Sequence, residues 1–210
     1  MKKIILFGIL LILMTALVSC NKIAFDDDGA FEFYPTEGGY VVAVRDPEYI
    51  KHMEEIEIPY LYKFKPVVGI ANNGFAYCSN LKQITIPSGV ETIGDYAFAG
   101  CTGLTSITIP DSVISIGDSA FRDCMSLTSV TIGNSVTSIG ASAFYWCKSL
   151  TSITIPEGVT SIGSYAFRYC YSLTNIKYRG TEAEWESISK GYRWDMYSGA
   201  YGITYNYDGE

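Results

Sequence analysis

Apolar residues recur along most of the chain at a fixed interval of 23 residues. Three positions of the repeat keep this interval without a break: one is always leucine, one always cysteine and one always phenylalanine. These columns are Leu81, Leu104, Leu127, Leu150 and Leu173; Cys78, Cys101, Cys124, Cys147 and Cys170; and Phe75, Phe98, Phe121, Phe144 and Phe167. A fixed period of this length is typical of a solenoid, in which each repeat forms one coil that stacks on the next.

The order of apolar and polar positions within one unit predicts the shape of the coil. The unit reads L-x-x-I-x-I-P-x-x-V-x-x-I-G-x-x-A-F-x-x-C-x-x, with Val130 and Gly133 as departures. The alternation around Ile107 and Ile109 predicts a short strand with one buried side. Phe121 and its apolar neighbours are spaced as in one helical turn. The pattern therefore predicts an α/β solenoid with one parallel sheet and short helical turns on the opposite face.

Both ends of the repeat region depart from the pattern, as solenoid ends do. FEFY and YVVAV flank PTEGG and predict a hairpin cap over residues 31–52, and five extra residues near 60–65 predict a bulge in the first coil. Thr181 and Glu184 form a capping-box pattern, and Gly191 is placed to end the helix that follows. The pattern therefore predicts a solenoid over residues 53–178, followed by a helix and strand cap over residues 179–210.

The L-x-x-I-x-I-P and A-F-x-x-C signatures resemble the BspA-like leucine-rich repeats of bacterial surface proteins. The commoner leucine-rich pattern has Asn or Cys three residues after the last apolar residue of the strand, where this chain has Gly89, Ser112, Ser135 and Gly158. The resemblance covers roughly residues 53–190. It implies a right-handed leucine-rich repeat solenoid, and it implies adhesion to host matrix proteins or to other bacteria.

The first twenty residues resemble a bacterial lipoprotein signal. Lys2 and Lys3 precede an apolar run over residues 4–16, and Leu17 to Cys20 reads LVSC, which matches a lipobox. We therefore expect a signal peptide over residues 1–19, a lipid on Cys20 and a tether over residues 20–30. The alternative is a plain signal peptide that contains Cys20. The lipobox predicts an outer membrane lipoprotein, exposed at the surface of a Gram-negative cell and bound to the membrane through its lipid only.

Charge and residue chemistry disfavour several classes of function. Removal of residues 1–19 takes away two lysines and no acidic residue, so the formal net charge changes from −7 to −9. Nucleic-acid binding needs clustered Lys and Arg, so no nucleic-acid partner is expected. His52 is the sole histidine, and no nucleotide, hydrolase or metal motif accompanies it. We expect no enzyme activity, no cofactor and no metal, and we expect the repeat cysteines to be buried and reduced.

Two surfaces remain as candidates for binding. The outward positions of the predicted strands are mostly Ser and Thr, which could bind sugars or a peptide but also serve as soluble, strand-compatible residues. The two positions after each repeat phenylalanine vary, so they face solvent. Tyr, Trp and Arg gather there in two successive coils, and these are the residue types enriched in binding hot spots. The predicted patch consists of Tyr145, Trp146, Arg168, Tyr169 and Tyr171.

The sequence thus favours a non-catalytic, monomeric surface module that binds a macromolecule, either a host matrix protein, a bacterial surface protein or a glycan. Two alternatives stay open. One is a surface lipoprotein that captures glycans for an uptake system, and the other is a scaffold with no ligand of its own. A further possibility is that the rings of the predicted patch only cover one another.

Overall fold

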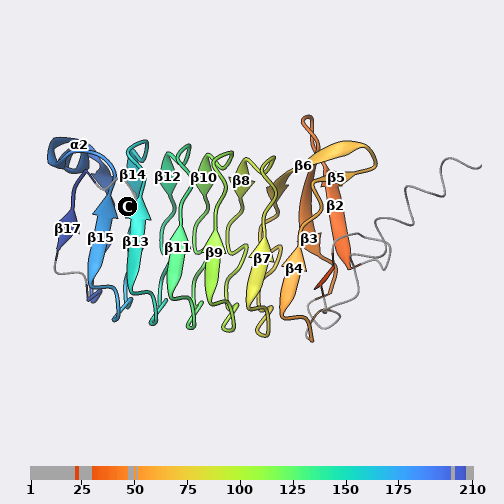
Figure 1. Ribbon diagram of the computed structural model, residues 1–210, viewed down its shortest axis with the longest axis horizontal. Helices are drawn as coiled ribbons and strands as arrows, with labels where there is room; N and C mark the ends of the chain where they lie inside the picture. Colours follow the sequence, from red (N-terminus) through yellow and green to blue (C-terminus); the bar gives the residue numbers. More distant parts are fainter. Residues whose placement is uncertain (1–21, 24–29, 47–49, 51, 200–201, 207–210) are drawn as a thin grey trace, which may run out of the picture.

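Each 23-residue unit forms one coil with two short strands, and equivalent strands of successive coils lie parallel along the rod (Figure 1). The computed structural model describes residues 22–23, 30–46, 50, 52–199 and 202–206. In a central coil the first strand is β9 (Ser106–Thr108) and the second is β10 (Ser115–Ile116). The coils stack into a straight rod, with the first coils and the last coils at its two ends.

The first strands of successive coils lie side by side along the front of the rod as seen in Figure 1. They form a five-stranded sheet in the order β17-β15-β13-β11-β9 and a three-stranded sheet in the order β1-β4-β7. Their remaining bounds are β1 (Lys22–Ile23), β4 (Glu55–Glu57), β7 (Gln83–Thr85), β11 (Ser129–Thr131), β13 (Ser152–Ile155), β15 (Asn175–Tyr178) and β17 (Ile203–Thr204). The register pairs equivalent repeat positions, such as Ser129 with Ser106 on one side and with Ser152 on the other.

The second strands form a nine-stranded sheet, which runs β16-β14-β12-β10-β8-β6-β3-β2, with β5 paired to β6 off this path. The bounds are β2 (Phe31–Pro35), β3 (Tyr40–Val44), β5 (Leu61–Tyr62), β6 (Lys65–Ile70), β8 (Thr92–Ile93), β12 (Ser138–Ile139), β14 (Ser161–Ile162) and β16 (Ser189–Lys190). The prediction of a single parallel sheet was therefore incomplete. Two-residue strands are too short to show the alternation that marks a strand in a sequence.

The segments after each repeat glycine were predicted as helical turns, but they form turns whose N–H groups bond the next coil. Residues 119, 121 and 123 donate their backbone N–H groups to the carbonyls of residues 141, 143 and 145 in the next coil, at 2.8 Å each. Ser119 and Asp123 have φ values of +55° and +60°, which lie in the left-handed region. A helix would direct these N–H groups along its own axis. Here they join neighbouring coils instead, so stacking decides the conformation of this segment.

The core consists of the repeat columns stacked on themselves. Phe98, Phe121 and Phe144 are fully buried, and their parallel rings have centroids 5.2 Å apart. All five repeat cysteines are buried and free, as predicted. The Cys124 thiol also donates a hydrogen bond to the Phe98 carbonyl at 3.2 Å, and Cys147 does the same to Phe121 at 3.1 Å. The repeat pattern predicted that these cysteines are buried, but not that they form these hydrogen bonds.

Side-chain ladders join the coils along their edges. The Thr128 hydroxyl donates to the Thr105 carbonyl at 3.0 Å, and Thr151 repeats this contact one coil later at 3.1 Å. On another edge, a carboxylate oxygen of Asp95 accepts the Asp118 N–H at 2.8 Å. Each ladder uses the 23-residue offset. The Thr105 carbonyl also accepts the Thr128 N–H at 2.9 Å, so the threonine hydroxyls add to the backbone hydrogen bonds between coils.

Each end of the rod is closed by residues outside the repeat. Strands β2 and β3 pair in an antiparallel hairpin, which continues the nine-stranded sheet at the N-terminal end. At the other end, α2 (Glu182–Ser187) carries the predicted capping box, in which Thr181 and Glu184 bond each other's backbone and side chain. These two hydrogen-bonding groups of Thr181 lower the pKa of Glu184. Trp185 on this helix is buried against the last coils. In the described part of the chain, no helix is long and apolar enough to cross a bilayer.

Candidate binding surfaces

The structure brings the five predicted patch residues together on the turns that follow β12 and β14. The centroid of the Tyr169 ring lies 5.4 Å from that of Tyr145, 6.1 Å from that of Trp146 and 5.8 Å from that of Tyr171. Arg168 places its guanidinium 4.6 Å from the centroid of the Tyr169 ring and donates a hydrogen bond to the Tyr169 hydroxyl at 2.8 Å. Tyr169 is thus the centre of the group, which we call the aromatic cluster.

The aromatic cluster is larger than the sequence indicated. Tyr197 of the C-terminal cap stacks on Tyr169 with ring centroids 5.4 Å apart, and Arg168 also lies 4.9 Å from the Tyr165 ring centroid. The 23-residue period could not place Tyr197, because the last coil is longer. There Ser161 pairs with Ser189, 28 residues later. Counting in steps of 23 therefore aligns Tyr197 with Thr174, whereas the offset of 28 aligns it with Tyr169.

Cations cover several of the rings. Arg122 lies 4.8 Å from the ring centroid of Tyr145, and the Lys148 ammonium lies 4.4 Å from that of Trp146. Cation–π contacts at exposed sites contribute about 0.5–1 kcal/mol each. The cluster therefore combines aromatic rings with the cations of Arg168 and Lys148, while Arg122 is also paired with Asp123 at 3.2 Å, in a chain whose net charge is −7.

The outer part of the cluster is open to solvent. Trp146 is 36% exposed, Tyr171 56% and Tyr197 54%, whereas Tyr145 and Tyr169 are half-buried. The rings thus cover one another only in part. Apolar residues scattered singly on a surface are ordinary, but a contiguous group of exposed rings often marks an interaction site.

The backbone beneath the cluster is unfavourable for large side chains. Trp146 and Tyr169 have φ values of +63° and +64°. The same slot of earlier coils holds Tyr77, Gly100 and Asp123, and of these glycine and aspartate tolerate the left-handed region well. Folding of the coil therefore does not require an aromatic residue at this slot.

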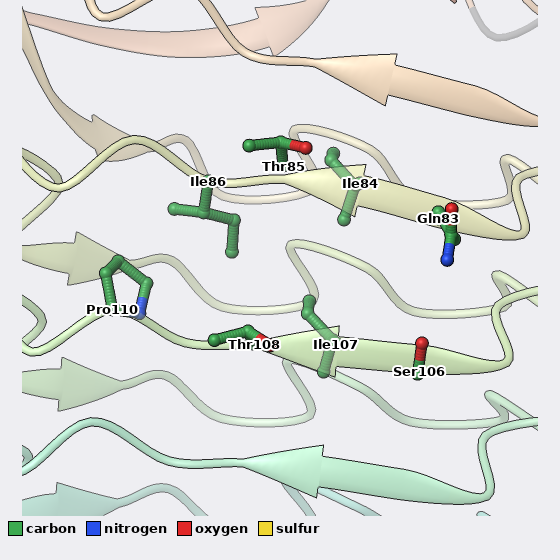
Figure 2. A pocket seen from close by; sticks show the side chains of 8 residues that line it. All are labelled: Gln83, Ile84, Thr85, Ile86, Ser106, Ile107, Thr108 and Pro110. Carbon is green, nitrogen blue, oxygen red and sulfur yellow. The ribbon is translucent and has the colours of Figure 1, made fainter.

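A second surface lies on the front of the rod, where β7 of the three-stranded sheet neighbours β9 of the five-stranded sheet. Gln83 and Thr85 of one coil and Ser106 and Thr108 of the next line a groove of about 320 Å³, which Ile86 and Pro110 close at one end. Figure 2 shows these side chains on two adjacent strands, on which the polar ones are exposed or half-buried and Ile84 and Ile107 are buried. The lining contains no aromatic or charged side chain. The groove thus supplies hydroxyl groups without an anchoring residue.

Among the described residues, the histidine and the repeat cysteines are the candidates for catalysis or metal binding. His52 is exposed, and no cluster of His, Cys, Asp or Glu in this part of the chain could hold a metal ion. Burial raises the pKa of the Cys124 and Cys147 thiols well above the usual range, so they are poor nucleophiles. Cys20 and the expected signal peptide lie outside the described residues.

Comparison with known proteins agrees with this architecture. The sequence profile of the BspA type leucine rich repeat region matches residues 68–189 in six copies. The chain belongs to this family. None of the curated proteins matches it.

Solved structures of leucine-rich repeat proteins resemble the chain. The leucine-rich repeat protein of T. pallidum is 30% identical with a TM-score of 0.68, and the match covers 74% of this chain and 71% of that protein. A leucine rich cell surface protein from Faecalibacterium prausnitzii is also 30% identical, with a TM-score of 0.65, over 79% of this chain and 41% of the other. A leucine-rich repeat protein from Eubacterium ventriosum, 24% identical with a TM-score of 0.54 over 86% of this chain and 53% of the other, shares the fold. The chain thus spans about half or less of the latter two proteins.

Proposed function

We propose that this BspA-type protein is a non-catalytic, surface-exposed lipoprotein that binds another protein through the aromatic cluster. The observation that carries the proposal is the set of exposed rings on slots where folding does not require them. Trp146 and Tyr169 occupy left-handed backbone positions that glycine and aspartate fill in two other coils. Aromatic residues and arginine dominate hot spots in protein interfaces. The cell-surface description of the Faecalibacterium relative is consistent with this role.

A protein partner fits the cluster better than a glycan does. Sugars stack on the flat face of an aromatic ring, so a glycan site needs free ring faces. Here Lys148 covers one face of Trp146, and Tyr197 stacks on Tyr169. The exposed edges and the cations instead suit a surface of mixed apolar and acidic side chains. The hydroxyl-lined groove of the front sheet is the more suitable place for a glycan, which keeps glycan capture as the second candidate.

Replacement of the exposed rings tests the proposed site. The mature chain with Cys20→Ser is assayed against purified extracellular-matrix proteins and a glycan array. Trp146→Gly combined with Tyr171→Ser should weaken protein binding by about 30-fold or more, because one hot-spot ring contributes about 2 kcal/mol. Glycine suits the left-handed backbone at 146, as Gly100 shows at the same slot, so the melting temperature should change little.

The matched control for this test is Tyr77→Gly. Tyr77 occupies the same slot in an early coil, has a φ of +63° and is 75% exposed, but it lies outside the cluster. Its replacement should leave binding unchanged. Equal loss of binding for both variants, or binding by the array glycans alone, would contradict the proposed site. A large fall in melting temperature with unchanged binding would show that the rings are structural.

The proposed membrane anchor is tested at Cys20. The Leu17–Cys20 motif predicts cleavage before Cys20 and a diacylglycerol on its sulfur. Cys20→Ala should leave the protein unprocessed or release it from the membrane fraction, since the acyl chains contribute about 0.8 kcal/mol per buried CH₂. Mass spectrometry of the mature N-terminus measures the result. Cleavage at another residue without an acyl mass would disprove the anchor.

A further inference from the structure

The first coil carries an insertion that projects from the rod and ends in an exposed phenylalanine. The five extra residues form the hairpin of β5 and β6, in which Leu61 pairs with Pro66 and Tyr62 pairs with Lys65. Phe64 at its tip is 99% exposed. Figure 1 shows this hairpin at the N-terminal end of the rod, beside the cap strands β2 and β3. The sequence predicted a bulge here but no structure or role for it.

The turn of this hairpin is unfavourable for the residues it contains. Lys63 and Phe64 form a two-residue loop with φ values of +49° and +64°. Such turns strongly prefer Asn-Gly, Asp-Gly or Gly-Gly, since both central residues need a positive φ. Phe64 makes almost no contact within the protein, so folding does not account for it. A bulky residue at such a position is consistent with a role outside the fold.

The hairpin has a firm base and an apolar outer side. The Tyr62 ring stacks on Phe33 of the cap with centroids 3.9 Å apart, which fixes the hairpin to β2. Tyr60 and Leu61 are 69% and 43% exposed, and Lys63 and Lys65 flank the phenylalanine. Aromatic and aliphatic tips flanked by lysines are typical of segments that lie at the boundary between lipid headgroups and acyl chains.

The start of the chain reaches the same end of the rod. Strand β1 pairs with β4, the first strand of the coil that carries the hairpin, so that Lys22 lies opposite Glu55. Cys20 precedes Lys22 by two residues, which span at most about 7 Å. The proposed lipid on Cys20 would therefore hold this end of the rod near the bilayer. A tether of this kind raises the effective concentration of the hairpin at the bilayer, so that even a small apolar tip can bind there.

We infer that the β5–β6 hairpin is a second membrane contact, which inserts Phe64, Tyr60 and Leu61 into the headgroup boundary of the anchoring bilayer. Lys63 and Lys65 would face anionic headgroups. With the lipid of Cys20, this contact would orient the rod so that the aromatic cluster, far along the coils, points away from the membrane. The inference rests on the proposed anchor at Cys20, but not on what the cluster binds.

An environment-sensitive label on the lipidated protein tests the inference. The protein carries Tyr60→Cys labelled with a nitrobenzoxadiazole dye and is reconstituted in vesicles of about three parts phosphatidylethanolamine to one part phosphatidylglycerol. The five repeat cysteines are buried and should not take up label. Headgroup-depth nitroxide lipids should quench this dye at least about two-fold more than a dye at Tyr171→Cys, which marks the far end of the rod.

Variants separate the possible outcomes. Phe64→Ser in the Tyr60→Cys protein should abolish the extra quenching while the protein still floats with the vesicles. The double variant Lys63→Gln and Lys65→Gln should reduce the extra quenching in these vesicles but not in phosphatidylcholine vesicles. Flotation without quenching at position 60 would overturn the hairpin contact and leave the anchor intact. Failure to float would overturn both, and quenching that persists in Phe64→Ser would show that the tip is not the contact.

Discussion

Gly140→Ala should destabilise the solenoid by about 3 kcal/mol or more, one of the largest effects expected for a single methyl group in this protein. A Cβ at Gly140 would lie 2.5 Å from the Gly117 carbonyl carbon and 2.6 Å from the Asp118 nitrogen of the preceding coil. These are backbone atoms, and Asp118 is itself held there by the Asp95 carboxylate. The clash can be relieved only by separating two coils, which would break the ladders between them.

The same close approach occurs at equivalent positions along the rod. A Cβ at Gly117 would meet Asp95, one at Gly163 would meet Ala141, and one at Gly191 would meet Ser164, all at less than 3.0 Å. This column fixes how tightly the coils stack. The helix α2 ends at Ser187, so the predicted role of Gly191 in ending it was wrong. The residue belongs to the glycine column instead.

Gly89→Ala is the matched control for this prediction. The nearest atom to a Cβ at Gly89 is the Val67 carbonyl oxygen at 3.5 Å, which is ordinary contact. Neither glycine has a positive φ, so alanine is compatible with both backbones. Gly89→Ala should change the free energy of unfolding by less than about 1 kcal/mol, with either sign. Urea denaturation of both variants measures the difference, and similar stabilities would show that the coils can separate at little cost.

Much of the fold can be predicted from the sequence because each position of the repeat can be compared across several units. A position that holds phenylalanine or cysteine in five successive units must be buried, and the structure buries all of them. The capping box at Thr181 is equally local, since its two hydrogen bonds need only residues three apart. The patch around Trp146 and Tyr169 followed from the same register, because equivalent positions stack.

The features that the sequence did not show depend on contacts between coils. The second strand of each coil has two residues, such as Ser138 and Ile139, and takes its partners from neighbouring coils. The left-handed turns exist because their N–H groups bond the next coil, which no propensity within one unit reveals. Tyr197 joined the aromatic cluster through a longer last coil. The sequence indicated no role for Phe64, because a residue in an insertion has no equivalent position in other units with which it can be compared.

Stability should fall steeply above pH 8, owing to the buried thiols. Burial raises the pKa of Cys124 and Cys147 above the ordinary value, and hydrogen bonding with Cys170 adds to this for Cys147. The pKa of Cys101 is raised first by hydrogen bonding with Cys78 and then by burial. The folded state therefore keeps these thiols protonated while the unfolded chain loses their protons near pH 8.5 to 9. A group whose pKa is raised on folding contributes stability below the unfolded value, and this contribution is lost as the pH rises above it.

The size of this loss in stability depends on the ionisation of the thiols in the unfolded chain alone. Each thiol that ionises only in the unfolded chain lowers the free energy of unfolding by about 1.4 kcal/mol between pH 8 and pH 10, so three thiols give about 4 kcal/mol. Urea denaturation at intervals of half a pH unit measures the slope. Tyrosines of the unfolded chain are about half ionised at pH 10, so the comparison ends at that value.

Cysteine variants isolate the contribution of the thiols from that of other groups. Cys124→Ala loses the hydrogen bond to the Phe98 carbonyl and leaves a small cavity, so its stability at pH 7 should fall by about 1–2 kcal/mol. Its loss between pH 8 and pH 10 should nevertheless be smaller than that of the unchanged protein by about 1.4 kcal/mol, because one titrating group is gone. An equal slope in both proteins would show that the Cys124 thiol ionises in the folded state, and the tight ladder of buried, hydrogen-bonded thiols would then have to open in alkali without unfolding the coils.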